Sequence, residues 1–410
     1  MLFRSAEAEN AAVIALHPFT GEVLTMLGSP DYFNEAIDGA VNATLALRQP
    51  GSTLKPFTYA LAMDPSREHP YTAATMLLDV HTPFVTRRLE SYAPANYGLA
   101  EHGPVSLREA LASSYNIPAV AALDYAGLGP FKQFMADLGL EELASNDRVD
   151  LSITLGGGEV RLLDLAAAYA AFPNGGYRIT PTLLLEVKER ASGADLYRWE
   201  APPLEQRVLD ERVAYLITDI LSDNEARIPS FGRNSALQVG RPAAAKTGTT
   251  TDFRDNWVVG YTPDLVIGVW VGNADNAPMV DISGITGAGP IYHLFLRDVL
   301  KDVPRRDFVE PPGIVRREVC ALSGLLPTPE CTQRKIERFI AGTEPTEYDN
   351  MHQVFAIDRR TGYLADESTP TEYRVRQTFI VLPQEARDWG IRMGIAQPRA
   401  SCGDRKSTRL

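Results

Sequence analysis

The sequence has no long hydrophobic run, no excess of positive charge and only three cysteines among its 410 residues. No uninterrupted apolar window of about 18 residues occurs, so no membrane span is predicted, and residues 1–10 lack the apolar centre of a signal peptide. The net charge of −12 argues against a nucleic-acid-binding surface. Hydrophobic residues make up 45% of the chain, which favours a globular protein of two or three domains.

Three cysteines are too few for a disulfide scaffold, and the spacing of Cys320, Cys331 and Cys402 fits no zinc pattern. Cys320 and Cys331 lie 11 residues apart around a turn that contains glycine and proline. They can form a local disulfide in an oxidising compartment. Two free thiols account for the sequence equally well.

Strand patterns occupy both ends of the first 300 residues, and helix patterns occupy the stretch between them. The predicted strands are 11–16, 22–27, 243–249, 256–261 and 265–271, and the predicted helices are 106–113, 119–138 with an interruption at 127–130, 162–172, 210–221 and 289–301. This order favours an α+β fold in which the first and last segments share one sheet.

Local signals refine these boundaries. Ser106 and Glu109 have the spacing of a capping box, which predicts a helix start, and Pro118 is expected to interrupt the helix at the residue before it. Residues 1–10 are expected to be a disordered start, followed by one domain over 11–303. The charged, proline-rich stretch 304–312 predicts a linker, and 313–400 a small β-rich module.

The segment Gly51-Ser52-Thr53-Leu54-Lys55-Pro56 contains the only Ser-x-x-Lys of the chain. Residues three apart share a helix face, so Lys55 Nζ can reach Ser52 Oγ and, with a lowered pKa, accept its proton. Proline is tolerated only in the first turn of a helix, so a helix should begin close to Ser52. Taken alone, the motif is more often a serine cap followed by a solvated lysine.

A second motif, Lys246-Thr247-Gly248-Thr249, lies on a predicted strand. Its glycine leaves room for a ligand to approach the backbone, and a cation with flanking hydroxyls suits a carboxylate. Taken alone, this motif is more often an edge strand with a solubilising lysine.

Two Ser-x-Asn segments could complete a site, Ser114-Tyr115-Asn116 and Ser222-Asp223-Asn224. The first is preferred because it lies between two predicted helices, where side chains can project into a cleft. The second follows a long helix and has the composition of an ordinary helix stop. Either one alone could be a polar turn.

Together and in this order, Ser-x-x-Lys, Ser-x-Asn and Lys-Thr-Gly are the signature of penicillin-binding proteins and serine β-lactamases. Segments 48–57, 155–160 and 255–263 resemble the transpeptidase domain of class A penicillin-binding proteins, and 320–324 with Cys331 is most similar to the 1C type. The resemblance covers nearly the whole chain. It implies the penicillin-binding and β-lactamase-like transpeptidase fold, an antiparallel sheet flanked by helices with a helical subdomain.

The resemblance implies a D,D-transpeptidase that cross-links peptidoglycan stem peptides through a serine acyl-enzyme and is inhibited by β-lactams. The implied catalytic residues are Ser52 (nucleophile), Lys55 (general base), Ser114 (proton relay), Asn116 (hydrogen bond to the substrate amide) and Lys246 (positive potential). Thr247, Gly248 and Thr249 are the implied substrate-binding residues, and the backbone N–H groups of Ser52 and Thr249 the oxyanion hole. No cofactor or metal is expected.

Three alternatives stay open at this point. A D,D-carboxypeptidase or a β-lactamase would hydrolyse the acyl-enzyme, and Glu159 is the one glutamate that could activate water for a class A β-lactamase. A β-lactam-binding sensor or scaffold would be acylated without turnover. A Ser-His-Asp hydrolase is a poor competitor, because no histidine lies near Ser52 in the sequence.

The resemblance also sets expectations for partners and compartment. Stem peptides, β-lactams and other cell-wall synthesis proteins are the expected partners, at the periplasmic face of the bacterial inner membrane. The family's membrane anchor and glycosyltransferase domain have no counterpart in these residues, so glycan polymerisation is not expected of this chain. Residues 401–410 do not resemble the family and are expected to be a non-native tail of a fragment.

Overall fold

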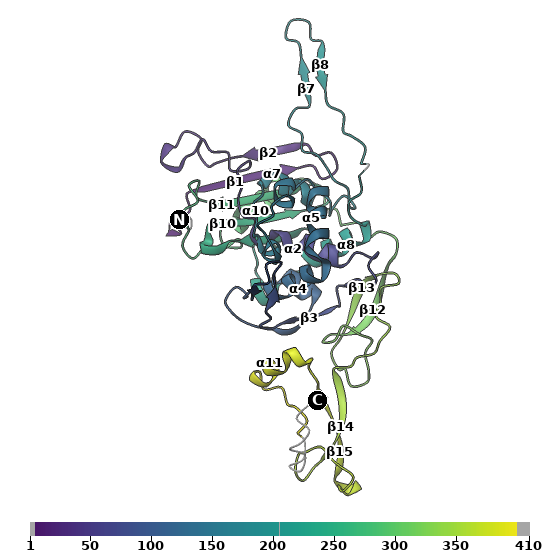
Figure 1. Cartoon of the computed structure of the whole chain (residues 1–410). Coiled ribbons are helices and arrows are strands. Elements are labelled where there is room, and N and C mark those ends of the chain that lie inside the picture. Colours follow the sequence, from purple (N-terminus) through teal and green to yellow (C-terminus); the bar gives the residue numbers. More distant parts are fainter. Residues whose placement is uncertain (1–4, 205, 400–410) are drawn as a thin grey trace.

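The computed structural model describes residues 5–204 and 206–399. Its centre is a five-stranded antiparallel sheet of order β2-β1-β11-β10-β9 (Figure 1). The first and last predicted strands therefore lie in one sheet, as predicted, and they pair directly with each other. The strands are β1 (Asn10–Leu16), β2 (Val23–Leu27), β9 (Ala244–Thr249), β10 (Asp255–Tyr261) and β11 (Val266–Gly272).

Alternating apolar residues give this sheet two buried faces. In β1, Ile14 packs into the core on the side of α7 (Leu162–Tyr169), whereas Val13 packs on the side of α10 (Ala288–Val299). All residues of β10 and β11 are buried, because helices cover both faces of these central strands. The sheet is thus the rigid middle layer on which the helices are placed.

The helices on the α7 side form a layer in which α4 is the central element. Its buried residues lie on all sides of the helix, as expected for a segment that is apolar throughout. The helices besides α7 and α10 are α2 (Lys55–Ala62), α3 (Leu107–Ala112), α4 (Asn116–Ala126), α5 (Leu128–Asp137), α6 (Glu141–Ala144), α8 (Glu211–Ser222), α9 (Ile228–Phe231) and α11 (Arg387–Arg392). No helix in the described part of the chain combines the length and the hydropathy needed to cross a bilayer.

The prediction that Pro118 interrupts a helix is wrong. Helix α4 begins at Asn116, and Pro118 lies in its first turn, where the missing N–H has no helical partner to lose. The interruption between α3 and α4 lies instead at Ser114, which adopts a left-handed conformation with a φ of 64°. The interruption predicted at 127–130 is confirmed as the boundary between α4 and α5.

The capping box is half confirmed. Ser106 Oγ accepts a hydrogen bond from the Glu109 N–H at 3.3 Å, so Ser106 caps α3 as predicted. The Glu109 carboxylate does not reach back to complete the pair; it accepts from the hydroxyl of Tyr115 instead.

The prediction of a disordered start does not hold for residues 5–10. Ala6 is buried, and its carbonyl accepts from the Val280 N–H at 2.9 Å. Asn273 bonds to the backbone of Glu7 and Glu9, so this segment is fastened beside β11 before β1 begins. The predicted tail, residues 401–410, lies outside the described residues.

The segment predicted as a small module contains two antiparallel hairpins and the short helix α11. The hairpins are β12 (Ile314–Cys320) with β13 (Arg334–Ile340), and β14 (His352–Asp358) with β15 (Arg374–Ile380). Cys320 and Cys331 form a disulfide, which confirms the local bridge that the sequence left open. The other strand pairs are β3 (Met76–Asp79) with β6 (Gly103–Ser106), β4 (Phe84–Val85) with β5 (Ser91–Tyr92), and β7 (Glu186–Lys188) with β8 (Asp195–Arg198).

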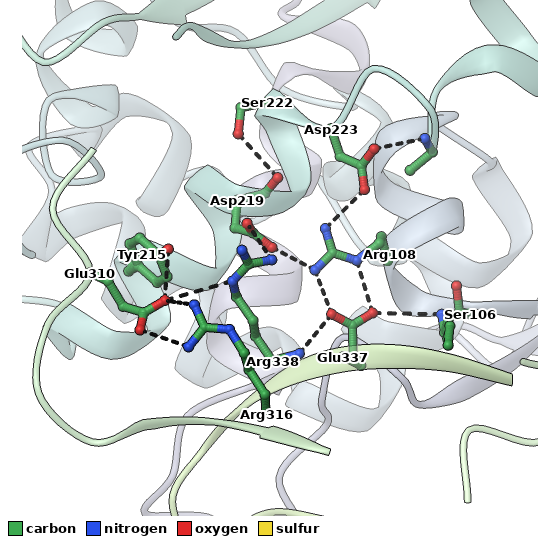
Figure 2. A network of polar contacts seen from close by, with 12 residues as sticks. Ser106, Arg108, Tyr215, Asp219, Ser222, Asp223, Glu310, Arg316, Glu337 and Arg338 are labelled. Carbon is green, nitrogen blue, oxygen red and sulfur yellow. Dashed lines mark hydrogen bonds and ion pairs between the residues drawn. The ribbon is translucent and has the colours of Figure 1, made fainter. Parts of the chain in front are cut away.

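A buried ion cluster joins the β12–β13 hairpin to the helical layer (Figure 2). Arg108 on α3 makes two hydrogen bonds to Glu337 on β13, at 2.6 and 2.9 Å. The same guanidinium pairs with Asp219 at 2.6 Å and with Asp223 at 3.1 Å, at the end of α8. Glu337 is 2% exposed, so this carboxylate has exchanged water for Arg108 as its partner.

Candidate active site

A cleft of about 630 Å³ opens between the sheet and the helical layer. It is lined by residues of all three motifs: Ser52, Ser114, Asn116, Thr247 and Thr249. The predicted site residues therefore come together from segments that lie far apart in the sequence. The roles assigned to them stay predictions.

Glycines bring the backbone around Ser52 against β9. Gly51 has a φ of 56°, and a Cβ on it would lie 2.8 Å from the Thr249 nitrogen. Gly156 lies against the other side of Gly51 and Gly248 against the Pro50 carbonyl, each too close for a side chain. The glycine-rich segment at 156–158 thus serves a close backbone approach that places Ser52 beside Thr249.

Ser52 lies in a 3-10 turn, Gly51–Leu54, that leads directly into α2. Pro56 occupies the first turn of this helix, as predicted. Among the hydrogen bonds of the described residues, Lys55 Nζ makes none to Ser52 Oγ, although the three-residue spacing would allow one. Other oxygen atoms satisfy the ammonium group instead.

Those oxygens come from the Ser-x-Asn segment. Lys55 Nζ donates to the carbonyl oxygens of Ser114 and Tyr115, at 2.6 and 3.0 Å, and to Asn116 Oδ1 at 2.7 Å. Ser114 Oγ lies 3.3 Å from Lys55 Nζ and 2.7 Å from Lys246 Nζ. The Ser114 hydroxyl therefore bridges the two lysines, and its left-handed backbone is what turns it between them.

Both lysines are almost fully buried, which disfavours their charged forms. Burial, and then the charge of Lys246, lower the pKa of Lys55 well below its usual value, although Asp79 opposes this. Burial, and then the charge of Arg227, lower the pKa of Lys246 to about 7. Two ammonium groups that share one hydroxyl repel each other, so one lysine is readily neutral and can act as a base.

The family model "Penicillin binding protein transpeptidase domain" matches residues 11–291, and "Penicillin-binding protein 1A, C-terminal domain" matches residues 310–354. This chain belongs to the penicillin-binding protein transpeptidase family. The predicted family and fold class are thereby confirmed.

Individual proteins of this family are also similar to the chain in sequence or in structure. The chain is 32% identical to penicillin-binding protein 2D of Bacillus subtilis, over 81% of this chain and 47% of that protein. It is also 32% identical to penicillin-binding protein 1C of Escherichia coli, over 82% of this chain and 41% of that protein. The crystal structure of penicillin-binding protein 1A from Haemophilus influenzae superposes with a TM-score of 0.72 and 27% identity, over 83% of this chain and 54% of that one. The chain thus spans less than half the length of these two curated relatives.

Sequence reasoning missed the residues beneath the transpeptidase motifs. The Asn116 N–H donates to Asn96 Oδ1 at 2.7 Å, and Asn96 Nδ2 donates to both oxygens of the buried Asp79. His102 contacts Asp79 through Nδ1 and stacks on Tyr115 with ring centroids 3.9 Å apart. Asp79 ends β3, and Asn96 and His102 lie in the segment that connects β3 to β6. No spacing in the sequence marks them, because only the tertiary fold places that hairpin under Asn116.

The structure also places the alternative candidates. Ser222 Oγ bonds to the Asp219 carbonyl at the end of α8, and Asp223 pairs with Arg108, so this Ser-Asp-Asn belongs to the ion cluster and not to the cleft. Glu159 is exposed and is not among the residues that line the cleft of the transpeptidase domain. Among the described lining residues, Asp252 is the one carboxylate, and it is exposed at the rim.

Proposed function

We propose that this chain is a serine D,D-transpeptidase that cross-links peptidoglycan stem peptides and is acylated by β-lactams at Ser52. The observation that carries the proposal is the continuous contact from Lys55 through the Ser114 hydroxyl to Lys246 beside the cleft that Ser52 lines. The match to the transpeptidase family model over residues 11–291 supports it.

In the proposed acylation step, Ser52 Oγ attacks the carbonyl carbon between two D-alanines and forms an ester. A neutral Lys55 accepts the Ser52 proton, either directly or through the Ser114 hydroxyl. Its lowered pKa makes the neutral form accessible at a lower pH than for an exposed lysine. Ser114 then passes a proton to the departing amine of D-alanine, while Lys246 holds the potential around Ser114 positive.

The oxyanion formed in this step needs donors that are in place before reaction. We assign them to the backbone N–H groups of Ser52 and Thr249, which the close approach of Gly51 to Thr249 brings to one side of the cleft. One such donor is worth about 3–4 kcal/mol in acyl-transfer enzymes. The hydroxyls of Thr247 and Thr249 are assigned to the terminal carboxylate of the substrate, next to the positive potential of Lys246.

Transfer is favoured over hydrolysis because the described residues that line the cleft include no buried carboxylate that could activate water. Glu159, the candidate from the sequence, is exposed and outside the lining of the cleft, and Asp252 lies at the rim. An amine from a neighbouring stem peptide would therefore be the proposed acceptor of the acyl group. The proposed setting is the periplasmic side of the inner membrane, with other cell-wall synthesis proteins as partners.

The test is intact-mass spectrometry after incubation with a penicillin, on the wild type and on Ser52→Ala. A stable adduct on the wild type alone is expected. A thioester donor that mimics the stem peptide, offered with and without a D-amino acid acceptor, then separates the alternatives. Transfer to the amine supports the transpeptidase, hydrolysis that ignores the amine supports a carboxypeptidase, and acylation with neither supports a sensor. Rapid loss of penicillin without an adduct would indicate a β-lactamase, and an adduct on Ser52→Ala would refute the assignment of the nucleophile.

A further inference from the structure

Four potential metal ligands converge where the two C-terminal hairpins meet. Cys320 ends β12, Cys331 lies in the loop before β13, and Asp349 and His352 lie at the start of β14. One ligand atom from each, two sulfurs, a carboxylate oxygen and an imidazole nitrogen, lie within 4.8 Å of one another. We call these residues the Cys2AspHis cluster.

The four ligand atoms lie somewhat closer together than a coordination sphere would hold them, because a disulfide joins the two sulfurs and a hydrogen bond joins Asp349 to His352. His352 Nδ1 lies 2.7 Å from Asp349 Oδ2 and 3.7 Å from Cys320 Sγ. Zinc bound by sulfur at about 2.3 Å and by nitrogen or oxygen at about 2.0–2.2 Å keeps tetrahedral ligands about 3.3–3.8 Å apart. Both cysteines are fully buried and Asp349 nearly so, which suits a closed structural site with four protein ligands.

The histidine and the aspartate distinguish this cluster from a simple disulfide. A structural disulfide needs no imidazole or carboxylate beside its sulfurs. A zinc site with only two cysteines needs two further ligands to reach four, and a histidine and an aspartate can supply them. Asp349 Oδ1 also accepts from the Met351 N–H in the turn, so the carboxylate is held in place by the backbone. The cysteine spacing alone excluded zinc because the other two donors lie 18 and 21 residues after Cys331.

We propose that the dithiol form of the Cys2AspHis cluster is a Zn²⁺ site, and that disulfide and metal are alternative cross-links of the same junction. A phosphine supplies two electrons to the Cys320–Cys331 bond and is oxidised to the phosphine oxide, while water supplies the oxygen atom and the two protons, which gives two thiols. Zn²⁺ then displaces those two protons and forms two Zn–S bonds, with Asp349 and His352 completing the coordination.

The two cross-links differ in what they connect. The disulfide closes only the loop between β12 and β13. A metal would in addition fasten the start of β14 to that loop, where the protein itself provides two backbone hydrogen bonds, between Leu326 and residues Glu347 and Asp349. Metal binding should therefore fix the second hairpin relative to the first, which the disulfide alone does not do.

The experiment uses the full chain in a Cys402→Ser background, so that the third cysteine cannot contribute. The protein is reduced with a phosphine, the reductant is removed without air, and Zn²⁺ is titrated in competition with a chromophoric chelator. One Zn²⁺ per chain is expected, with native mass spectrometry showing the gain of one zinc and the loss of two protons. Co²⁺ should give the sulfur-to-metal charge-transfer bands of a tetrahedral thiolate site.

His352→Gln and Asp349→Asn keep both thiols and test the other two ligands. Each is expected to weaken Zn²⁺ binding by at least about tenfold, since even changes outside the coordination sphere have effects of that size. His69→Gln, an exposed histidine, is the matched control and should bind as the parent does. Penicillin acylation of every variant reports that the transpeptidase domain is folded.

Hydrogen exchange gives a readout specific to the junction. Zn²⁺ should slow exchange at the start of β14 in the reduced parent and not in His352→Gln. The proposal is overturned if the reduced parent binds no Zn²⁺, if binding is unchanged in both ligand variants, or if Zn²⁺ leaves the exchange of β14 unaffected.

Discussion

Replacing Arg108 by glutamine should destabilise the chain by far more than an ordinary surface substitution. Arg108 on α3 contacts both α8, through Asp219, and β13, through Glu337. Its helix, α3, ends at Ala112, two residues before Ser114. The variant therefore also tests whether this junction supports the Ser-x-Asn segment.

The magnitude follows from the burial of the partners. The Arg108 side chain is 11% exposed and that of Glu337 is 2% exposed. Removing one partner of a buried pair typically costs about 3–5 kcal/mol; here Glu337 loses both hydrogen bonds from Arg108 and keeps the ion pair with Lys335 at 3.6 Å. A chain of this length has an unfolding entropy of about 0.9 kcal/mol/K at the midpoint. If unfolding is cooperative, Tm should fall by about 3–6 °C.

The assay is thermal unfolding followed by circular dichroism, paired with the rate of acylation by a fluorescent penicillin. Arg198→Gln is the matched control, because Arg198 pairs with two carboxylates on the β7–β8 hairpin but its side chain is 59% exposed. Exposed pairs contribute at most about 1 kcal/mol, so this variant should lower Tm by no more than about 1 °C. Equal Tm values for Arg108→Gln and Arg198→Gln would refute the argument from burial.

The pH dependence of this effect has a defined sign. Burial raises the pKa of Glu337, but the hydrogen bonds and charge of Arg108, together with Lys335, outweigh it and hold the pKa below its usual value. A carboxyl with a lowered folded-state pKa stabilises the protein above its unfolded-state pKa, about 4.3. The difference in Tm between wild type and Arg108→Gln should therefore have its largest value near neutral pH and become smaller as the pH falls below about 4.

Two further predictions concern the active site. Gly156→Ala should slow acylation by penicillin by about 100-fold, because a Cβ would push against the Gly51 nitrogen and displace Ser52. Gly342 is the control, because it has a similar φ of 93° and open space around it, so Gly342→Ala should be acylated at the normal rate. Equal rates for the two variants would contradict the argument from close approach. Arg227→Met should move the high-pH limb of the pH–rate profile of acylation, where Lys246 loses its charge, to higher pH. The reason is that removing the neighbouring cation lets the pKa of Lys246 rise from about 7. A high-pH limb that stays in place would contradict this role of Arg227.

The hydrophobic periodicity of the sequence and its local capping and turn signals were enough to predict the sheet and most helices. The runs that became β1, β10 and β11 are short, largely apolar and bounded by turn residues, which favours strands buried on both faces over helices. The caps Ser106 and Asp210 act within one turn of the chain, so the helix starts were also visible in the sequence. The error at Pro118 arose because a proline signals a helix start as well as a break, and only the conformation of Ser114 decides between them.

The sequence motifs identified the residues that line the cleft, but the contacts between these residues depend on the tertiary structure. Lys55 bonds to the Ser-x-Asn segment and not to Ser52, because burial leaves its ammonium group only the oxygens that α4 and the preceding turn present. The supports, Asp79 and Arg227, have no sequence signal, because they reach the site only through the packing of distant segments. The same holds for the Cys2AspHis cluster. Short-range patterns fix what a segment becomes, whereas charge pairing, pKa values and ligand sets depend on which segments the fold brings together.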